Sequence, residues 1–158
     1  MADTLAQLVD KLQTLLMSNL TIFNDHVCES AIRQSLLALN QVIPLNAATT
    51  VDAVSEQYEY ELYDPKAELI VDVLRQGLDT FADENISLDF DAYFEDDRPF
   101  YRLHCPQATG TTLIVRYTKP HTISGLDDET DSTLTHAQEI TLIDGAAYRA
   151  CLQRPAKS

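Results

Sequence analysis

The stretch from Leu113 to Leu152 decides the fold, and it reads LIVRYTKPHTISGLDDETDSTLTHAQEITLIDGAAYRACL. Apolar and polar residues alternate over 113–117, which predicts a half-buried strand. A polar, acidic loop follows at 120–134. This loop has few apolar residues, so we expect it to pack poorly in the free subunit and to become ordered by a partner.

The segment 135–153 is expected to be a helix. Thr135 and Gln138 have the spacing of a capping box, in which each side chain satisfies a free backbone amide of the first turn. Residues 139–144 are rich in β-branched side chains and could form a strand instead. The alanines and the basic end that follow favour the helix.

The N-terminal part predicts an antiparallel helical hairpin over 4–43. Thr4 and Gln7 form a capping box for a helix at 4–17, and Asn24 caps a helix at 25–41. Each helix has an apolar stripe at helical spacing. The first stripe is Leu5, Leu8, Val9, Leu12, Leu15 and Leu16, and the second is Val27, Ala31, Ile32, Leu36, Leu39 and Val42 or Ile43.

The centre of the chain predicts an antiparallel β-meander over 56–119. Period-2 alternation marks strands at 57–63, 86–94 and 101–105, separated by turn residues. Residues 68–74 would suit a helix or a strand, and their β-branched content favours a strand. The fold class is therefore α+β, with the C-terminal helix packing with the N-terminal helices.

The composition is typical of one domain, 1–158. The chain has 158 residues, 45% of them hydrophobic, and no apolar run long enough to cross a membrane. The three scattered cysteines, Cys28, Cys105 and Cys151, form no CxxC pair, so we expect reduced and mostly buried thiols and assembly in a cytoplasm.

The net charge is −14, from 25 acidic and 11 basic residues. Phosphate backbones would repel such a chain, which argues against sequence-driven binding of DNA or RNA. An acidic wall would nevertheless suit a pore that conducts DNA without gripping it. Simple solubility is the alternative explanation of the acidic clusters.

Several motifs occur in a characteristic order along the chain. They are the second helix ending at Pro44-Leu45, Thr49-Thr50-Val51 before the first strand, the run 115–122 with Gly125-Leu126, Ser132-Thr133-Leu134, and Gly145 to Tyr148. This order, and the run 115–122 with Gly125-Leu126 most specifically, resembles the head-to-tail adaptor, or connector, proteins of tailed bacteriophages. The acidic run Asp127 to Asp131 departs from this pattern.

The resemblance implies a structural virion protein that forms a ring, commonly dodecameric, beneath the portal. Such a ring joins the head to the tail and extends the DNA channel. The implied partners are the portal protein, tail or neck proteins and further copies of the chain, with DNA passing through non-specifically and no membrane. The implied location is the virion, assembled in the bacterial host cytoplasm.

No residue pattern indicates an enzyme, a metal site or a cofactor. His104 and Cys105 are neighbours on a strand and would point to opposite faces, so they cannot act as a pair. His121 with Asp127 or Asp128 matches no ligand spacing. The sequence also contains no GxSxG, P-loop or HExxH motif. We therefore expect neither catalytic residues nor metal ligands.

Two groups of residues are candidates for interaction. Partner contacts are predicted at Tyr93, on the outward face of its strand, and at the basic residues Arg149, Arg154 and Lys157. Gly145 would permit close approach of another helix. The acids predicted to line the channel or to dock a partner are Glu95, Asp96, Asp97, Asp127, Asp128, Glu129 and Asp131. The alternative function is a tail or baseplate β-module that binds a host receptor.

Overall fold

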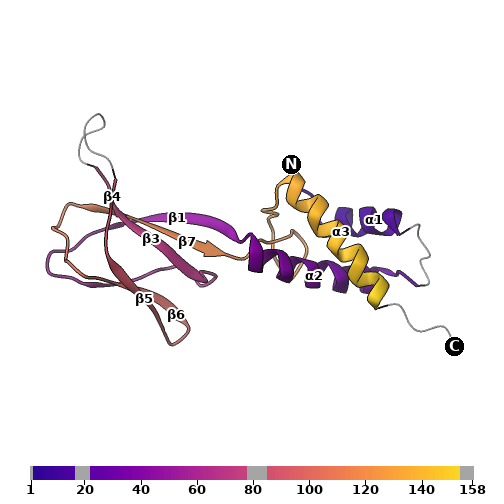
Figure 1. The fold of residues 1–158 in the computed structure, drawn as a ribbon, viewed down its shortest axis with the longest axis horizontal. Coiled ribbons are helices and arrows are strands. Elements are labelled where there is room, and N and C mark those ends of the chain that lie inside the picture. Colours follow the sequence, from indigo (N-terminus) through magenta and orange to yellow (C-terminus); the bar gives the residue numbers. More distant parts are fainter. Residues whose placement is uncertain (1, 17–21, 78–84, 154–158) are drawn as a thin grey trace. The chain divides into compact units, whose positions relative to one another are not determined.

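The computed structural model describes residues 2–16, 22–77 and 85–153, and it is an α+β protein (Figure 1). It divides into two compact units, each described below by itself. The helical unit comprises residues 1–44 and 121–158, and the β unit comprises residues 45–120. The prediction of one domain over 1–158 stays a prediction.

The described residues of the helical unit contain three helices: α1 (Leu5–Leu15), α2 (Asp25–Val42) and α3 (His136–Leu152). Both predicted capping boxes are present, and the Asn24 side chain accepts a hydrogen bond from the Val27 amide at 3.0 Å. The helix predicted at the C-terminus is confirmed as α3. Its predicted packing is confirmed too, because α3 contacts both α1 and α2.

The core of the helical unit is built from all three helices and from the loop before α3. Two predicted core positions are wrong. Leu15 is 50% exposed, and neither alternative at the end of α2 is buried, because Val42 is 78% and Ile43 47% exposed. These residues lie at the C-terminal ends of α1 and α2. The buried apolar residues include Leu8, Leu12, Cys28, Ile32, Leu36, Leu39, Ile123, Leu126, Leu142, Ala146 and Ala150.

Helices α2 and α3 approach each other closely at Gly145. A Cβ atom at this position would lie 2.7 Å from the Ser35 hydroxyl oxygen, which is closer than any real contact allows. The buried Ser35 hydroxyl donates a hydrogen bond to the Leu142 carbonyl oxygen at 2.8 Å. The expectation that a small residue at 145 admits another helix is therefore confirmed within this chain.

The expectation of a poorly packed loop at 120–134 is wrong. Its few apolar residues are spaced so that Ile123, Leu126 and Leu134 are all at least 96% buried in the helical core. Hydrogen bonds also tie the loop to the N-terminus. The Leu5 amide donates to the Ser124 carbonyl at 2.8 Å, and the Ser132 hydroxyl donates to the Asp3 carbonyl at 2.7 Å.

The β unit contains two antiparallel sheets. The first has the order β1-β7-β3-β4, and the second has the order β2-β6-β5. The strands are β1 (Leu45–Asp52), β2 (Glu59–Glu61), β3 (Leu69–Arg75), β4 (Ile86–Ser87), β5 (Phe90–Glu95), β6 (Arg98–Leu103) and β7 (Thr112–Lys119). The two sheets share one core, in which the rings of Tyr60 and Tyr101 stack with their centroids 5.5 Å apart.

The β unit differs from the sequence prediction at two points and agrees with it at a third. It begins at Leu45 rather than at 56, because β1 pairs with β7 over its full length. The predicted strand 86–94 is divided, because β4 joins one sheet and β5 joins the other. The strand favoured at 68–74 is confirmed as β3.

No helix in the described ranges is both long and apolar enough to cross a membrane.

The three cysteines are free, as expected, but only Cys28 is buried, whereas Cys105 and Cys151 are exposed. The prediction of mostly buried thiols is therefore wrong. Cys105 follows the end of β6, and Cys151 lies on the outer side of the last turn of α3.

The contact between Gly145 and Ser35 predicts the effect of Gly145→Ala. The new methyl group would displace the Ser35 hydroxyl and break its buried hydrogen bond, which costs about 1–3 kcal/mol. The gain in helix propensity is only about 1 kcal/mol. We expect the free energy of unfolding, measured by urea denaturation, to fall by roughly 1 kcal/mol.

The control is the same substitution in a Ser35→Ala background, where the hydroxyl is absent. There Gly145→Ala should raise the free energy of unfolding, because the remaining close contact, 3.1 Å to Nη1 at the flexible end of Arg149, can be relieved by a side-chain shift and the propensity gain dominates. Equal effects of Gly145→Ala in the two backgrounds would contradict the close contact as the cause.

Candidate interaction surfaces

The predicted acids Glu95, Asp96 and Asp97 form the tip of the β5–β6 hairpin. Glu95 and Arg98 are register partners, so the turn has two central residues, Asp96 with φ 52° and Asp97 with φ 61°. Positive φ at both positions is typical of the type I′ turns that match strand twist, and Asp adopts this region more readily than most residues. All three acids are exposed.

The second acidic group lies in the helical unit. Asp127 and Asp128 occupy a similar turn, with φ 52° and φ 62°, closed by a hydrogen bond from the Glu129 amide to the Leu126 carbonyl at 3.1 Å. Asp127 forms an ion pair with Arg33 of α2. This group is therefore anchored to its own unit and partly neutralised, and Asp131 is exposed beside it.

Tyr93 lies on the outward face of the sheet β2-β6-β5, as predicted. Its ring stacks on Phe100 of the neighbouring strand, with centroids 5.5 Å apart and planes 10° apart. Desolvation raises the pKa of Tyr93, and the nearby Glu59 and Glu95 carboxylates raise it further. The guanidinium of Arg98 lies 5.8 Å from the centroid of Phe100, so cation–π contact extends this aromatic group.

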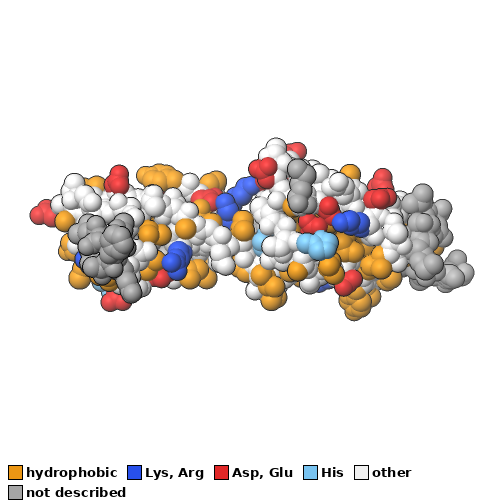
Figure 2. Space-filling view, turned by 90° about the horizontal axis from the view of Figure 1, so that it is seen from above, with side chains coloured by type: hydrophobic (Ala, Val, Ile, Leu, Met, Phe, Trp, Pro, Cys, Tyr) orange, Lys and Arg blue, Asp and Glu red, His pale blue; other side chains and the backbone are white. Residues whose placement is uncertain are grey.

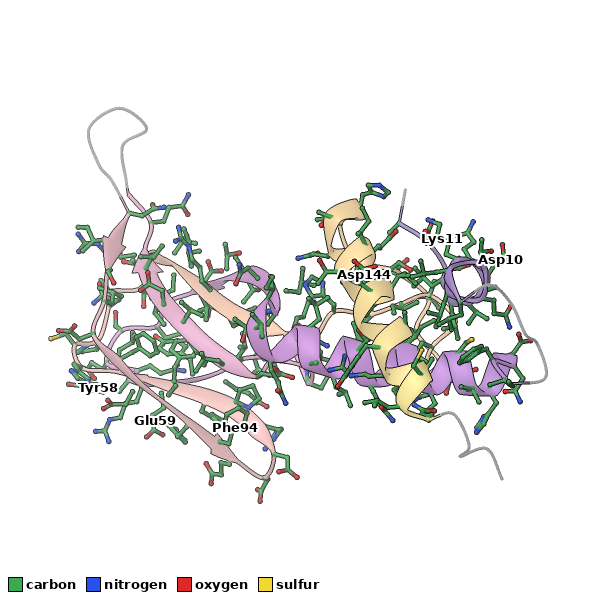
Figure 3. The ribbon with its side chains drawn as sticks, turned by 45° about the vertical axis from the view of Figure 1, so that its right-hand side comes forward. Asp10, Lys11, Tyr58, Glu59, Phe94 and Asp144 are labelled. Atoms are coloured by element: carbon green, nitrogen blue, oxygen red, sulfur yellow. The ribbon has the colours of Figure 1, made fainter. Side chains whose placement is uncertain are left out.

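Phe94 and Tyr58 add exposed aromatic surface to the same unit, with 58% and 41% of their side chains exposed (Figure 3). Arg102 lies over the Tyr58 ring at 6.0 Å. Aromatic rings and arginines are enriched in protein interfaces, because they combine apolar area with directional polar contacts. We name Tyr58, Tyr93, Arg98 and Phe100 the aromatic face; Phe94, which follows Tyr93 on β5, points to the other side of the sheet.

Arg149 lies in the last turn of α3, where a cation suits the negative end of the helix dipole. Its Nη1 atom donates a hydrogen bond to the Gly145 carbonyl oxygen at 3.1 Å, which fixes the side chain along the helix. The other two predicted basic contacts, Arg154 and Lys157, lie outside the described residues.

Two apolar grooves flank α3, and the sequence interpretation did not identify them. The α1–α3 groove encloses about 340 Å³ and is lined by Lys11, Thr14, Leu15, His136, Glu139, Ile140, Ile143 and Asp144. The α2–α3 groove encloses about 250 Å³ and is lined by Ser35, Ala38, Leu39, Val42, Ile43, Thr141, Leu142, Gly145 and Arg149. Figure 2 shows hydrophobic side chains, in orange, reaching the surface of the face that it presents.

His121 is buried, and each of its two ring nitrogens lies within hydrogen-bonding distance of a partner. Its Nε2 atom lies 3.1 Å from the Ile43 carbonyl oxygen, and its Nδ1 atom lies 3.0 Å from the Thr133 hydroxyl. The His121 amide donates to the Asn40 side chain at 2.7 Å. The residue therefore holds the chain where it returns to the helical unit, and burial lowers the pKa of its imidazole.

His104 and Cys105 do not form a pair with each other in the described structure. His104 instead lies 3.1 Å from the Asp91 carboxylate, and both residues are exposed. Within the described ranges, no three His, Cys, Asp or Glu side chains gather in a way that could hold a metal ion.

No family model matches the chain, and no curated protein matches it. Among solved structures, the chain is similar to a chain in the neck of an empty gene transfer agent particle with C6 symmetry. The TM-score is 0.40 at 13% identity, covering 95% of this chain and 80% of that one.

Two further structures of this particle type are also similar to the chain. One is the neck of a native gene transfer agent particle with C12 symmetry, with a TM-score of 0.39 at 12% identity, covering 100% of this chain and 84% of that chain. The other is the virion of a native particle, with a TM-score of 0.38 at 10% identity, covering 85% and 80%.

The buried His121 predicts a pH dependence of stability. Because burial lowers its pKa, the unfolded chain binds the proton more readily than the folded chain below about pH 6.5. The contribution of His121 to the free energy of unfolding is therefore fully present above about pH 6.5. It is lost as the pH falls through that value toward the lowered pKa. We expect a lower melting temperature at pH 5.5 than at pH 7.5.

His121→Gln should remove much of this pH dependence, even if it lowers the melting temperature at pH 7.5. The matched control is His26→Gln, which changes an exposed histidine of α2 and should retain the wild-type dependence. If both variants show the same change in melting temperature between pH 7.5 and pH 5.5, His121 is not the source of the pH dependence.

Proposed function

We propose that the protein is a structural subunit of a virion neck, a ring beneath the portal that joins head to tail and extends the DNA channel. The observation that carries the proposal is the amount of large apolar surface left exposed on both units. Contiguous exposed apolar side chains mark surfaces that are covered in an assembly. The order of the adaptor-like motifs along the chain supports a neck assembly in particular.

The motifs of the resemblance occupy defined positions in the fold. Residues 115–122 comprise most of β7 and the return of the chain to the helical unit. Gly125, with φ 94°, and the buried Leu126 begin the turn that anchors the acidic loop. Gly145 lies in close contact with Ser35 of α2. These residues are therefore fixed by the fold itself, as motifs of an adaptor scaffold would be.

The proposed mechanism is assembly rather than catalysis. Lateral contacts close a ring, and other surfaces contact the portal protein on one side and tail or neck proteins on the other. The candidates for these contacts are Tyr93 and Arg149, with Arg154 and Lys157 in the undescribed C-terminus. The protein acts in the virion, which is assembled in the host cytoplasm, and DNA passes through the ring without sequence-specific binding.

Electron cryo-microscopy of purified particles tests this proposal. We expect density for this chain in a closed ring on the portal axis, even if the purified protein is monomeric, because weak lateral contacts form on a template. The control is a particle preparation from a strain that lacks the gene, in which heads should lack attached tails. Single copies located away from the portal axis would refute the proposal.

A tail or baseplate module that binds a host receptor is the second candidate function. The aromatic face favours it, because exposed aromatic side chains beside arginines provide a binding surface on a sheet. The same images decide between the two functions. Density at the distal end of the tail, rather than at the neck, would establish the second function.

The hairpin tip carries a prediction about DNA passage. If Glu95, Asp96 and Asp97 line the channel, their charge keeps DNA from binding the wall, and only groups within about 8 Å matter at physiological salt. Glu95→Lys with Asp96→Asn and Asp97→Gly replaces three negative charges by one positive charge and keeps residues that suit the turn. We expect slower genome ejection, measured by dye release at low salt, because each lysine adds phosphate contacts.

The control is Asp96→Asn with Asp97→Gly alone, which improves the turn sequence without adding a positive charge. Its ejection rate should lie between those of the wild type and the lysine variant. Wild-type ejection rates for the lysine variant, in particles with normal tails, would show that these three acids lie away from the channel. The acids at 127–131 would then be tested in the same way.

A further inference from the structure

We propose that the ring is closed by a head-to-tail contact between unlike grooves, in which the α2–α3 groove of one copy packs on the α1–α3 groove of the next. The proposed occupant of each groove is therefore a second copy of this chain. This inference rests on the proposed ring and adds the surfaces and the charge pair that would form it.

The α1–α3 groove combines apolar residues with ionisable residues of both signs, among them Lys11 and Asp144. Leu15 and Ile140 are 50% and 52% exposed, although both are large apolar residues. Glu139 is buried, and its Oε1 atom accepts a hydrogen bond from the Asp3 amide at 2.9 Å. Lys11 forms an ion pair with Asp3.

Asp144 provides the free charge of this groove. Its side chain is exposed, and within the described ranges no hydrogen bond or ion pair reaches its carboxylate. Figure 3 shows Asp144 on α3 and Lys11 on α1, the two helices that border the groove. The groove therefore offers an apolar surface with an available carboxylate.

The α2–α3 groove has the complementary character. Val42 and Ile43 are 78% and 47% exposed, and they extend the apolar lining provided by Ala38 and Leu39. Its ionisable lining residue is Arg149, which is half-buried and held along α3 by the Gly145 carbonyl. This groove therefore presents an apolar surface with a fixed guanidinium.

The two grooves lie on opposite flanks of the buried stripe of α3. At 3.6 residues per turn, Ile140 and Asp144 fall on one side of the stripe, and Thr141, Gly145 and Arg149 fall on the other. One copy can therefore bind a neighbour on each flank at the same time. A contact between unlike surfaces, repeated around an axis, closes into a ring, whereas a contact between like surfaces stops at a dimer.

Charge favours the unlike pairing over the like pairing. The chain carries a net charge of −14, so association of two copies needs local attraction to offset their repulsion. Asp144 against Arg149 supplies it. A like pairing of two α2–α3 grooves brings the two Arg149 side chains together with no carboxylate in the lining, and in a like pairing of two α1–α3 grooves the lining cation Lys11 is already paired with Asp3. Like charges at an interface oppose association strongly.

Charge reversal tests this contact in particles that carry the variant as their sole copy. Asp144→Lys and Arg149→Glu should each lower the yield of tailed particles about tenfold, because each opposes like charges at every lateral contact. The double variant, Asp144→Lys with Arg149→Glu, restores an opposite pair between neighbours and should recover most of the yield. A double variant no better than the worse single variant would overturn the inference.

The matched control is Asp10→Lys. It makes the same charge change at an exposed position of α1 that does not line the α1–α3 groove, and Figure 3 labels it beside Lys11. We expect a wild-type yield of tailed particles. A tenfold loss here as well would mean that net charge, rather than the pair, controls assembly, and would overturn the inference.

Disulfide crosslinking tests which surfaces meet. In a Cys105→Ser, Cys151→Ser background, the chain with both Ile140→Cys and Val42→Cys should give a ladder of covalent multimers after oxidation of the particles. Each single-cysteine chain should remain monomeric. Dimers of a single-cysteine chain would show that like surfaces meet. No crosslinks in particles whose imaged ring contains this chain would overturn the contact but leave the neck function standing.

Discussion

The pairing of β1 with β7 is the constraint on which the rest of the structure depends. Leu45 and Lys119 are register partners, so the chain leaves the helical unit and returns to it at neighbouring points. The helical unit is discontinuous in sequence, and closing a flexible segment between its two parts would cost conformational entropy. The paired strands avoid this cost, because they hold the two ends of the segment together. His121 completes the closure, because it bonds the Asn40 side chain and the Ile43 carbonyl just inside the return point.

Much of the fold was predictable wherever local chemistry and periodicity agree. The spacing of Thr135 and Gln138 predicts a capping box, and the structure contains it. This box favoured a helix over a strand for the following residues, although they are rich in β-branched side chains. β1 was missed because it is rich in Ala and Thr, and its two larger apolar residues, Leu45 and Val51, lie near its opposite ends. Its place is set by the long-range partner β7, which periodicity within a window cannot reveal.

The candidate surfaces were less predictable, because an apolar residue on a helix has the same signature whether it is covered by its own chain or by another. Val42 fits the stripe of α2 but is 78% exposed, and Ile140 adds an apolar side chain beyond the core stripe of α3. The loop at 120–134 shows the opposite error. Its average polarity is high, yet single residues such as Ile123 and Leu126 suffice to anchor it in the core.

The two turns built on consecutive aspartates have a consequence for how this chain can change during evolution. Asp96-Asp97 and Asp127-Asp128 all have φ between 52° and 62°, a conformation that Asp, Asn and Gly adopt most readily. The codons of Asp differ from those of Asn and Gly by one base. The charge at each tip can therefore be reduced one step at a time by single mutations that preserve the backbone, whereas lysine requires a larger genetic change and strains the turn. Selection can adjust the electrostatics of these tips independently of their shape.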